Sequence, residues 1–415
     1  MPAPMRLVLI ADTFPPFRTS GAVQLRDLSR EWVRQGHEPT VMLPSSDVKN
    51  GWQLEVVDGV RILRLRAPKT KDIGFIRRTI AEFLMPFFMR HHLLRSPLAG
   101  ERWDGVVWYT PSIFHGPLAK SIKQTSGCKG YLIIRDIFPN WAVDMGLMGR
   151  GLPFRFFDAV ARYQYAVADV IGVQTIGNMA YFRNWQSEPD RQLEVLQNWL
   201  GEVSSQACSI SLTETSLAGR KVFVYAGNMG VAQGMAVLLD LAEALRRRKD
   251  VGFLFVGRGS EAKQLATSAA ARGLDNVVFK DEIHPDEIPA LYSQCAIGLV
   301  ALDPRHKSHN IPGKFLTYMQ NGLPVLAYVN AGNDLAALIR QEQVGQVCEG
   351  NHPENLLSLA QRLLAQLETD QGLAGRCRQL FAHMFSVEQA ARQIVEALAP
   401  SEKSLSKEPP SATRI

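Results

Sequence analysis

The chain has 415 residues, of which 46% are hydrophobic, and a formal net charge of +6. Its length favours two domains over one, and no apolar run approaches the ~20 residues that a membrane-spanning helix requires. The excess of basic residues favours anionic partners, but these residues are spread along the chain, which argues against a nucleic-acid-binding arm.

The N-terminus and the cysteines restrict the class of protein further. The apolar run at residues 7–11 is too short for a signal-peptide core and continues into Asp12, so we expect a cytoplasmic protein. The five cysteines are odd in number and widely spaced, and they form no CxxC pair, which predicts neither a disulfide framework nor a zinc site. They are Cys128, Cys208, Cys295, Cys348 and Cys377.

The first predicted elements form a strand, a turn, a helix and a second strand. An apolar strand at residues 7–10 ends in a turn of small residues that includes Ser20 and Gly21, and an amphipathic helix follows as far as Gly36. A strand at residues 40–43 completes a βαβ unit. The helix directs its free N–H groups at whatever lies above the strand, so Ser20 and Gly21 are candidate phosphate-binding residues.

Further strands follow in the first half of the chain. An Asp58-Gly59 pair is suited to join the first two of them as a tight hairpin, and the others are buried apolar runs of the kind found in parallel sheets. They are expected at residues 54–57, 60–65, 106–109, 131–134, 170–173 and 194–196.

Residues 69–95 combine many large apolar side chains with flanking cations. One interpretation is a segment that lies in a membrane interface beside anionic headgroups. The alternative is an ordinary pair of helices packed on the first sheet. In either case Pro86 is expected to break or kink the segment near its middle.

Candidate catalytic residues in this half follow buried strands. Arg135 and Asp136 come directly after the strand at 131–134, at the edge where ligands bind in parallel sheets. Asp136 can orient or deprotonate an acceptor hydroxyl and Arg135 can bind a phosphate, or the two can simply form an ion pair that shapes the loop. His115, before a helix, is a further candidate catalytic residue, although a lone histidine is more often structural.

The second half repeats the strand, turn and helix pattern. After a polar stretch at residues 201–220, interpreted as a linker, a strand at 222–225 leads into a glycine-rich turn at 227–234 and a helix at 235–247. Five more strands are expected, at residues 252–256, 277–279, 297–300, 325–328 and 346–348. Two such series predict an α/β fold of two Rossmann-like, doubly wound domains that face a cleft, rather than one long sheet.

Several motifs, in this order and spacing, resemble the GT-B fold glycosyltransferases of family GT4. They are Thr13-Phe14-Pro15-Pro16, Gly36-His37, Asn198-Trp199, Tyr225-Ala226-Gly227-Asn228, Val256-Gly257 and Ile311-Pro312-Gly313-Lys314-Phe315 followed by Gly322-Leu323-Pro324-Val325.

The resemblance implies an acceptor-binding domain at residues 1–200 and a nucleotide-sugar-binding domain at 201–383. A helix at 384–400 is expected to return to the first domain, and a disordered tail to occupy 401–415.

The resemblance also implies a donor site, which the local physics supports. The helix that begins at Gly313 can direct its N–H groups at a diphosphate, and Lys314 can add a cation. Gly227 allows the backbone to approach phosphate. Asn228 and Gln233 stand where many relatives have arginine and lysine, so two cations that would neutralise the diphosphate are missing. The positive charge then has to come from Lys314, Arg258, Arg305 or Lys307. Arg305 and Lys307 can equally belong to a solvated loop without a role in binding.

A second departure concerns the paired glutamates that many family members use to bind the donor sugar and ribose. These positions align near His309 and Thr317, and neither is a carboxylate here. His309 and Asn310 can still donate hydrogen bonds to a hydroxyl or a phosphate. Isoleucine-proline-glycine-lysine-phenylalanine sequences of this kind occur among relatives that make bacterial surface polysaccharides, including N-acetylfucosaminyltransferase-like enzymes.

The expected function is therefore retaining transfer of a sugar from a nucleotide diphosphate donor such as UDP, with an acetamido sugar as one candidate. The expected acceptor is a polyprenyl-diphosphate-linked saccharide of O-antigen, capsule or exopolysaccharide synthesis, reached at the inner face of the cytoplasmic membrane.

No DxD motif occurs where a metal would be bound, and no cofactor or nucleic acid is expected. The alternatives are a nucleotide-sugar epimerase of the same fold and a non-catalytic sugar-nucleotide-binding protein. A dinucleotide oxidoreductase is disfavoured because Gly257-Arg258-Gly259 lacks the third glycine.

Overall fold

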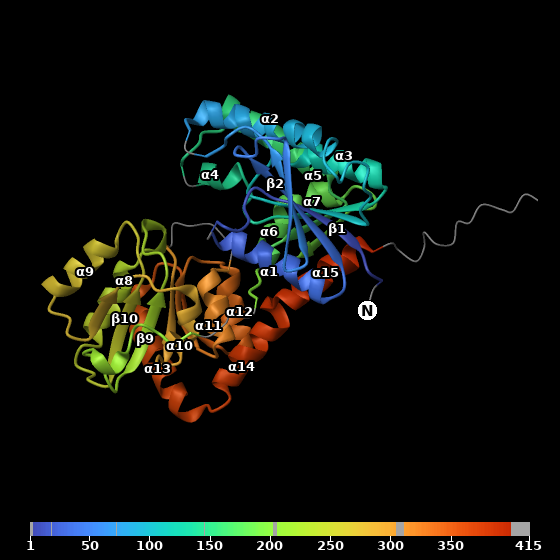
Figure 1. The fold of residues 1–415 in the computed structure, drawn as a ribbon. Coiled ribbons are helices and arrows are strands. Elements are labelled where there is room, and N and C mark those ends of the chain that lie inside the picture. The colour runs from blue at the N-terminus through green and yellow to red at the C-terminus, as the bar shows by residue number, and fades with distance from the viewer. Residues whose placement is uncertain are drawn as a thin grey trace, which may run out of the picture. The chain divides into compact units, whose positions relative to one another are not determined.

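The computed structural model describes residues 3–17, 19–71, 73–144, 146–201, 206–303 and 311–399. It divides into two compact units. The first comprises residues 1–173, 179–196 and 387–415, and the second comprises 174–178 and 197–386. Each unit is a doubly wound α/β structure (Figure 1), so the predicted fold class is confirmed.

The first unit contains an eight-stranded sheet in the order β3-β4-β2-β1-β5-β6-β7-β8. All neighbouring strands are parallel except β3 and β4, which form the antiparallel hairpin expected at Asp58-Gly59. The strands are β1 (Arg6–Ile10), β2 (Glu38–Ser45), β3 (Trp52–Val57), β4 (Val60–Arg66), β5 (Gly105–Tyr109), β6 (Lys129–Ile133), β7 (Val170–Val173) and β8 (Gln192–Val195).

The helices of this unit follow from apolar stripes on otherwise polar segments. In α1, Leu25, Leu28 and Trp32 are buried. The Trp32 indole donates a hydrogen bond to the Ala391 carbonyl of α15, 3.3 Å away, and this bond helps to tie the C-terminal helix to the first unit. The helices are α1 (Ser20–Arg34), α2 (Phe75–Leu93), α3 (Gly116–Ser126), α4 (Asn140–Asp144), α5 (Leu152–Val167), α7 (Arg183–Gln186) and α15 (Val387–Leu398), with α6 (Ile176–Met179) spanning the boundary between the units.

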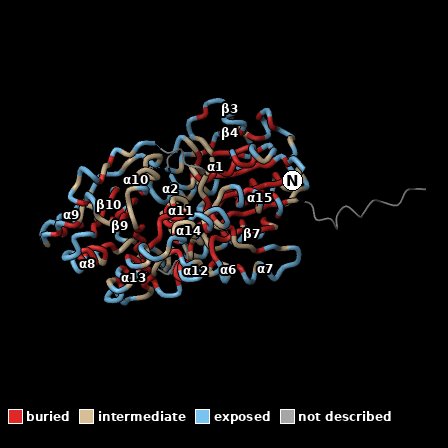
Figure 2. Tube along the Cα trace, turned by 90° about the horizontal axis from the view of Figure 1, so that it is seen from below, coloured by how far each residue is buried: buried red, intermediate tan, exposed pale blue. Residues whose placement is uncertain are grey.

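The second unit contains a six-stranded parallel sheet in the order β11-β10-β9-β12-β13-β14. The four central strands are buried along almost their whole length, as Figure 2 shows by the red colour at β9 and β10, because helices cover both sides of the sheet. The strands are β9 (Lys221–Ala226), β10 (Val251–Val256), β11 (Val277–Lys280), β12 (Ile297–Ala301), β13 (Val325–Val329) and β14 (Gly345–Glu349), and the helices are α8 (Ala236–Ala244), α9 (Ala262–Ala271), α10 (Ile288–Tyr292), α11 (Gly313–Gln320), α12 (Asp334–Glu342), α13 (Leu356–Thr369) and α14 (Leu373–Leu380).

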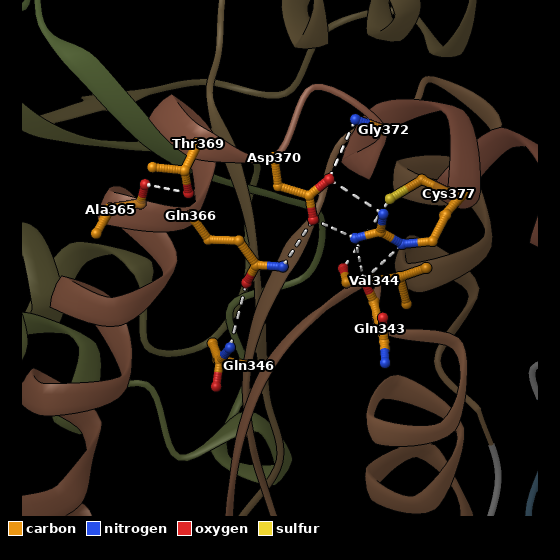
Figure 3. Close-up of polar contacts among 10 residues, drawn as sticks. Gln343, Val344, Gln346, Ala365, Gln366, Thr369, Asp370, Gly372 and Cys377 are labelled. Carbon is orange, nitrogen blue, oxygen red and sulfur yellow. Dashed lines mark hydrogen bonds and ion pairs between the residues drawn. The ribbon is translucent and has the colours of Figure 1, made fainter.

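A polar cluster joins the end of α13 to the start of α14 (Figure 3). The Asp370 carboxylate accepts hydrogen bonds from the Gly372 N–H at 3.1 Å and from the Arg376 guanidinium. The same guanidinium donates to the Gln343 carbonyl after α12. These donors, Arg376 foremost, lower the pKa of Asp370 to about 2. The cluster connects the turn between the two helices to the end of α12.

Two sequence-based expectations need correction. The segment was expected to break or kink at Pro86, or to form a pair of helices; it does not break there, because α2 continues through Pro86 as one helix. A proline removes one backbone donor, and the buried stripe of Ala81, Met85, Met89 and Leu93 holds the helix on both sides of it. The stretch at residues 201–220, which was interpreted as a linker, packs against the second unit from residue 206 onward. Leu212 and Leu217 are buried in the core of the second unit.

Candidate functional site

In the second unit, the direction of the strand order reverses between β9 and β12. Helices that leave two such strands lie on opposite faces of the sheet and leave a crevice at the carboxyl ends. The glycine turn at 227–234 follows β9 at this point. Helix α11 begins at Gly313, and its N-cap residue Pro312 makes no side-chain capping hydrogen bond. Among the described residues, the N-terminal N–H groups of α11 therefore lack the usual N-cap acceptor.

Close backbone contact explains the glycines of this turn. Gly227 has a φ of +140°, a conformation that side-chain-bearing residues rarely adopt. Its N–H donates to the Val256 carbonyl at the end of β10, 2.9 Å away. A Cβ atom added to Gly257 would lie 2.1 Å from the Gly227 carbonyl oxygen. The turns after β9 and β10 thus fit together only because both positions are glycine.

Lys314 lies against this turn. Its Nζ donates a hydrogen bond to the Tyr225 hydroxyl at 2.9 Å and lies 4.4 Å from the centroid of the same ring. The Tyr225 hydroxyl in turn donates to the Asn228 carbonyl at 2.7 Å. Burial lowers the pKa of Lys314 to about 8. Within the described ranges no carboxylate forms an ion pair with this ammonium group, so its charge remains available to an anion.

The other predicted donor-binding residues of this unit make contacts of their own. The Gln233 side-chain oxygen accepts from the Gly230 N–H at 3.0 Å and from the Asn228 amide at 3.5 Å. Arg258 is exposed and pairs with Glu282 at 2.9 Å. The Thr317 hydroxyl donates to the Gly313 carbonyl at 3.3 Å. The remaining candidates, His309 and Asn310 together with Arg305 and Lys307, lie outside the described residues.

The first unit has its own reversal of strand order, between β1 and β5. Gly21 lies at this point in the first turn of α1, where an added Cβ would be 3.2 Å from the Tyr109 hydroxyl at the end of β5. Ser20, the first residue of α1, is exposed. The preceding Thr19 caps the helix by accepting from the Ala22 N–H at 3.3 Å.

Arg135 and Asp136 follow β6 at the same edge of the sheet. The Arg135 backbone N–H donates to the Thr110 hydroxyl at 2.6 Å, and its buried guanidinium lies 5.6 Å from the Tyr109 ring centroid. Asp136 is accessible to solvent, yet the surrounding protein raises the pKa of its carboxyl, an effect that Arg135 partly offsets. An accessible carboxyl crowded by protein is suited to accept a proton from a bound hydroxyl.

His115 is fully buried at the N-terminal end of α3. Neither ring nitrogen has a hydrogen-bond partner among the described residues. Burial lowers the pKa of His115, and Asp12, which follows β1, works in the opposite direction. The imidazole is therefore neutral at pH 7. Asp12, His115 and Asp136 all belong to the carboxyl edge of the first sheet.

Sequence reasoning missed three residues at these sites, namely Tyr225, Asp12 and Tyr109. Each lies at or just after the carboxyl end of a central strand: Tyr225 in β9, Asp12 after β1 and Tyr109 in β5. Their polar groups at the carboxyl ends of parallel strands, where ligands bind, could have indicated these residues from the sequence. The groups that they contact come from distant parts of the chain, so the sequence gives no indication of which partner each one meets.

Comparison with known proteins finds a family match for part of the chain. Residues 220–366 match a family model described as "Glycosyl transferases group 1". This part of the second unit is therefore similar to a glycosyl transferases group 1 domain. The match includes the glycine turn, Tyr225 and Lys314.

Two curated bacterial proteins are similar to a larger part of the chain. The putative colanic acid biosynthesis glycosyl transferase WcaI of Escherichia coli (strain K12) is 24% identical over 276 residues, which cover 61% of this chain and 62% of WcaI. The probable glycosyltransferase WbjE of Pseudomonas aeruginosa is 23% identical over 245 residues, covering 57% and 60%. The chain thus matches about three-fifths of the length of each relative.

The solved structure of HepE from Anabaena in complex with UDP has the same fold. It aligns with a TM-score of 0.66 at 15% identity, over 95% of this chain and 99% of HepE. The GT-B fold class expected from the sequence is thereby confirmed. At this identity the likeness shows the fold alone.

Proposed function

We propose that this protein is a retaining, GT4-type glycosyltransferase that moves a sugar from a nucleotide diphosphate donor, UDP, to a lipid-linked saccharide in bacterial surface-polysaccharide synthesis. The observation that carries the proposal is Lys314, an ammonium group with no ion-pair partner among the described residues. It lies beside the glycine turn of β9 and in the first turn of α11, a helix whose N-cap residue Pro312 makes no side-chain capping hydrogen bond. A cation, helix N–H groups and close backbone are the elements that bind a diphosphate.

The leaving group explains why these elements matter for catalysis. Negative charge develops on the diphosphate as the glycosidic bond breaks, and a preorganised cation stabilises that charge more in the transition state than in the ground state. No protein nucleophile is needed when the acceptor attacks from the face that the diphosphate leaves. The donor contact is supported by HepE, whose structures are described as complexes with UDP and with UDP-glucose.

The acceptor is assigned to the first unit. Asp136 is accessible, and the protein around it raises the pKa of its carboxyl, so it can orient an acceptor hydroxyl and receive its proton. Surface-polysaccharide synthesis is supported by the printed name of WcaI, which refers to colanic acid.

A thermal-unfolding screen of UDP, GDP and dTDP, alone and as sugar conjugates, tests the donor. A ligand at a hundred times its Kd adds about 2.7 kcal/mol to the free energy of unfolding, so UDP or a UDP-sugar is expected to raise Tm by several degrees. Incubation of the stabilising donor with and without a lipid-linked acceptor then separates transfer from epimerisation. Absence of stabilisation by every nucleotide would contradict the proposal.

We also propose that α2 and its flanks, residues 69–95, dock the protein on an anionic membrane. None of the helices in the described ranges is long and apolar enough to cross a bilayer. On the outer face of α2, however, large side chains are exposed, including Ile76 at 78% and Ile80 at 55%. Arg77, Arg78 and Arg90 are exposed beside them, the arrangement of an interfacial helix.

Replacement of Arg77, Arg78 and Arg90 by glutamine should weaken co-sedimentation with anionic vesicles, most clearly at low salt. Each cation near a charged bilayer contributes about 1 kcal/mol, and salt screens that attraction. The control variant replaces Arg246, Arg247 and Lys263 of the second unit, which removes the same charge elsewhere. Equal binding by the α2 variant and the wild type at low salt would rule out this surface.

A further inference from the structure

A row of aromatic rings crosses the first unit from α2 to the loop after β6. Successive ring centroids lie 6.2 Å apart for Phe87 and Phe83, 6.2 Å for Phe83 and Phe156, and 5.2 Å for Phe156 and Phe157. The row continues from Phe157 to Phe138 at 5.2 Å and from Phe138 to Trp141 at 6.2 Å. We call these residues the aromatic track: Phe87, Phe83, Phe156, Phe157, Phe138 and Trp141.

The two ends of the track are open to solvent. Phe87 is 50% exposed, Phe83 44%, Phe156 41% and Trp141 43%, whereas the two middle rings, Phe157 and Phe138, are partly buried and pack against the core of the first unit. Isolated exposed aromatic residues need no explanation, but several connected exposed rings on a soluble protein usually mark a binding surface. The rings come from α2, α5, the loop before α4 and α4 itself.

One end of the track lies beside the proposed acceptor residues. Phe138 is two residues beyond Asp136, and Trp141 follows in α4, where its N–H donates to the Ile137 carbonyl at 3.0 Å. The track therefore connects the exposed face of α2 with the loop that holds Asp136.

The nearby charges favour a lipid phosphate over an acidic or basic protein partner. Within the described ranges, two acidic side chains of α2 and α5 are held by their own cations: Glu82 by Arg78 at 2.8 Å, and Asp158 by Arg162 at 2.7 Å. Arg155, between two aromatic residues of α5, is exposed. Aromatic faces bury hydrocarbon, while an exposed cation such as Arg155 at the border suits phosphate.

We propose that the aromatic track binds the hydrocarbon chain of the lipid-phosphate acceptor and leads its head to Asp136. This inference rests on the proposed function and adds to it the path of the acceptor chain. A flexible polyprenyl or acyl chain gains most of its affinity from the apolar area that it buries. The track thus sets the acceptor class, whereas the cations of residues 69–95 only bring the protein to the bilayer.

Titration calorimetry with farnesyl phosphate, below its micelle concentration, tests the track without any donor. The wild-type chain should bind farnesyl phosphate at least tenfold more tightly than inorganic phosphate. In the double variant Trp141→Gln, Phe156→Gln this preference should fall on the order of tenfold, since apolar contact is lost at two rings. The control variant Val56→Gln, Tyr181→Gln alters two similarly exposed apolar residues off the track and should keep the wild-type affinity.

Four further results decide the interpretation. Unchanged farnesyl phosphate affinity in the track variant would overturn the proposal, and so would a variant that loses only binding to phosphatidylglycerol vesicles, because the track would then be a bilayer surface. Stabilisation of the track variant by UDP, equal to that of the wild type, is expected and shows that the chain remains folded. Farnesyl phosphate binding without any nucleotide binding would contradict the proposed function, but it would still support the aromatic track as a lipid-phosphate binding surface.

Discussion

Replacing Lys314 by alanine should lower kcat/KM for sugar transfer on the order of a hundredfold, with little change in Tm. The loss follows from removing a preorganised cation from the departing diphosphate, which typically costs this much or more. Stability should be nearly unchanged because burial already disfavours the charged form of Lys314. Steady-state kinetics with the donor found in the unfolding screen, together with thermal unfolding, measure both effects.

The pH dependence gives this assignment a second, independent test. Burial lowers the pKa of Lys314 to about 8, so the ammonium form predominates below that pH and is lost above it. The profile of kcat/KM, which reports the free enzyme, should therefore fall as pH rises through about 8. In the Lys314→Arg variant this alkaline limb should disappear, whatever its remaining activity, because arginine stays charged.

Two tyrosine variants distinguish the role of the lysine from general packing. The Tyr225 hydroxyl accepts a hydrogen bond from the Lys314 ammonium group, which favours the charged form, so Tyr225→Phe should move the alkaline limb to lower pH. Tyr318→Phe removes a buried hydroxyl bonded to the Val224 and Leu299 carbonyls and should affect stability but not the limb. Unaltered kcat/KM in Lys314→Ala would contradict the leaving-group role.

The parts of the fold that could be predicted from the sequence are those determined by the pattern of apolar residues and glycines within a short segment. Buried apolar runs such as those of β9 and β10 and glycines before helices depend on a few neighbouring residues, so strands, turns and doubly wound topology followed from them. The position of Lys314 could also be predicted from the sequence. Ile311-Pro312 ends the preceding segment, so a helix that contains Lys314 has to begin directly after it.

The details that escaped prediction depend on contacts between distant segments. Tyr225 and Lys314 are separated by 89 positions, and the register that brings them together comes from packing of α11 against the sheet. The error at Pro86 has the same origin. Local propensity favours a break there, but a buried stripe on both sides of the proline outweighs one missing hydrogen bond.

The aromatic track was only partly predictable from the sequence. The sequence indicated the apolar and basic character of residues 69–95, and left open whether these residues face lipid or the sheet. The structure shows a buried and an exposed side on one helix: Met85 and Met89 are buried, while Phe83 and Phe87 are exposed. The continuation of the exposed side to Phe156 in α5 could not be inferred, since it depends on the packing of two helices.

Substituting Gly227 by valine should abolish donor binding in a chain that still folds. At a φ of +140° a side chain carries a backbone cost of about 1–3 kcal/mol, and the new Cβ would lie 3.6 Å from the Lys314 Cε. The branched side chain would therefore occupy the space where backbone and Lys314 meet the diphosphate. Titration calorimetry with UDP is expected to show no measurable binding.

The matched control is Gly219→Val, also in the second unit. Gly219 has a φ of +75°, and an added Cβ meets no atom within 4 Å, so this variant carries a similar backbone cost away from the site. Both variants should lose stability by comparable amounts, and only the Gly227 variant should lose UDP. If Gly227→Val is folded and binds UDP with wild-type affinity, the β9 turn does not approach the phosphates, and Lys314 would have to meet the diphosphate from the α11 side alone.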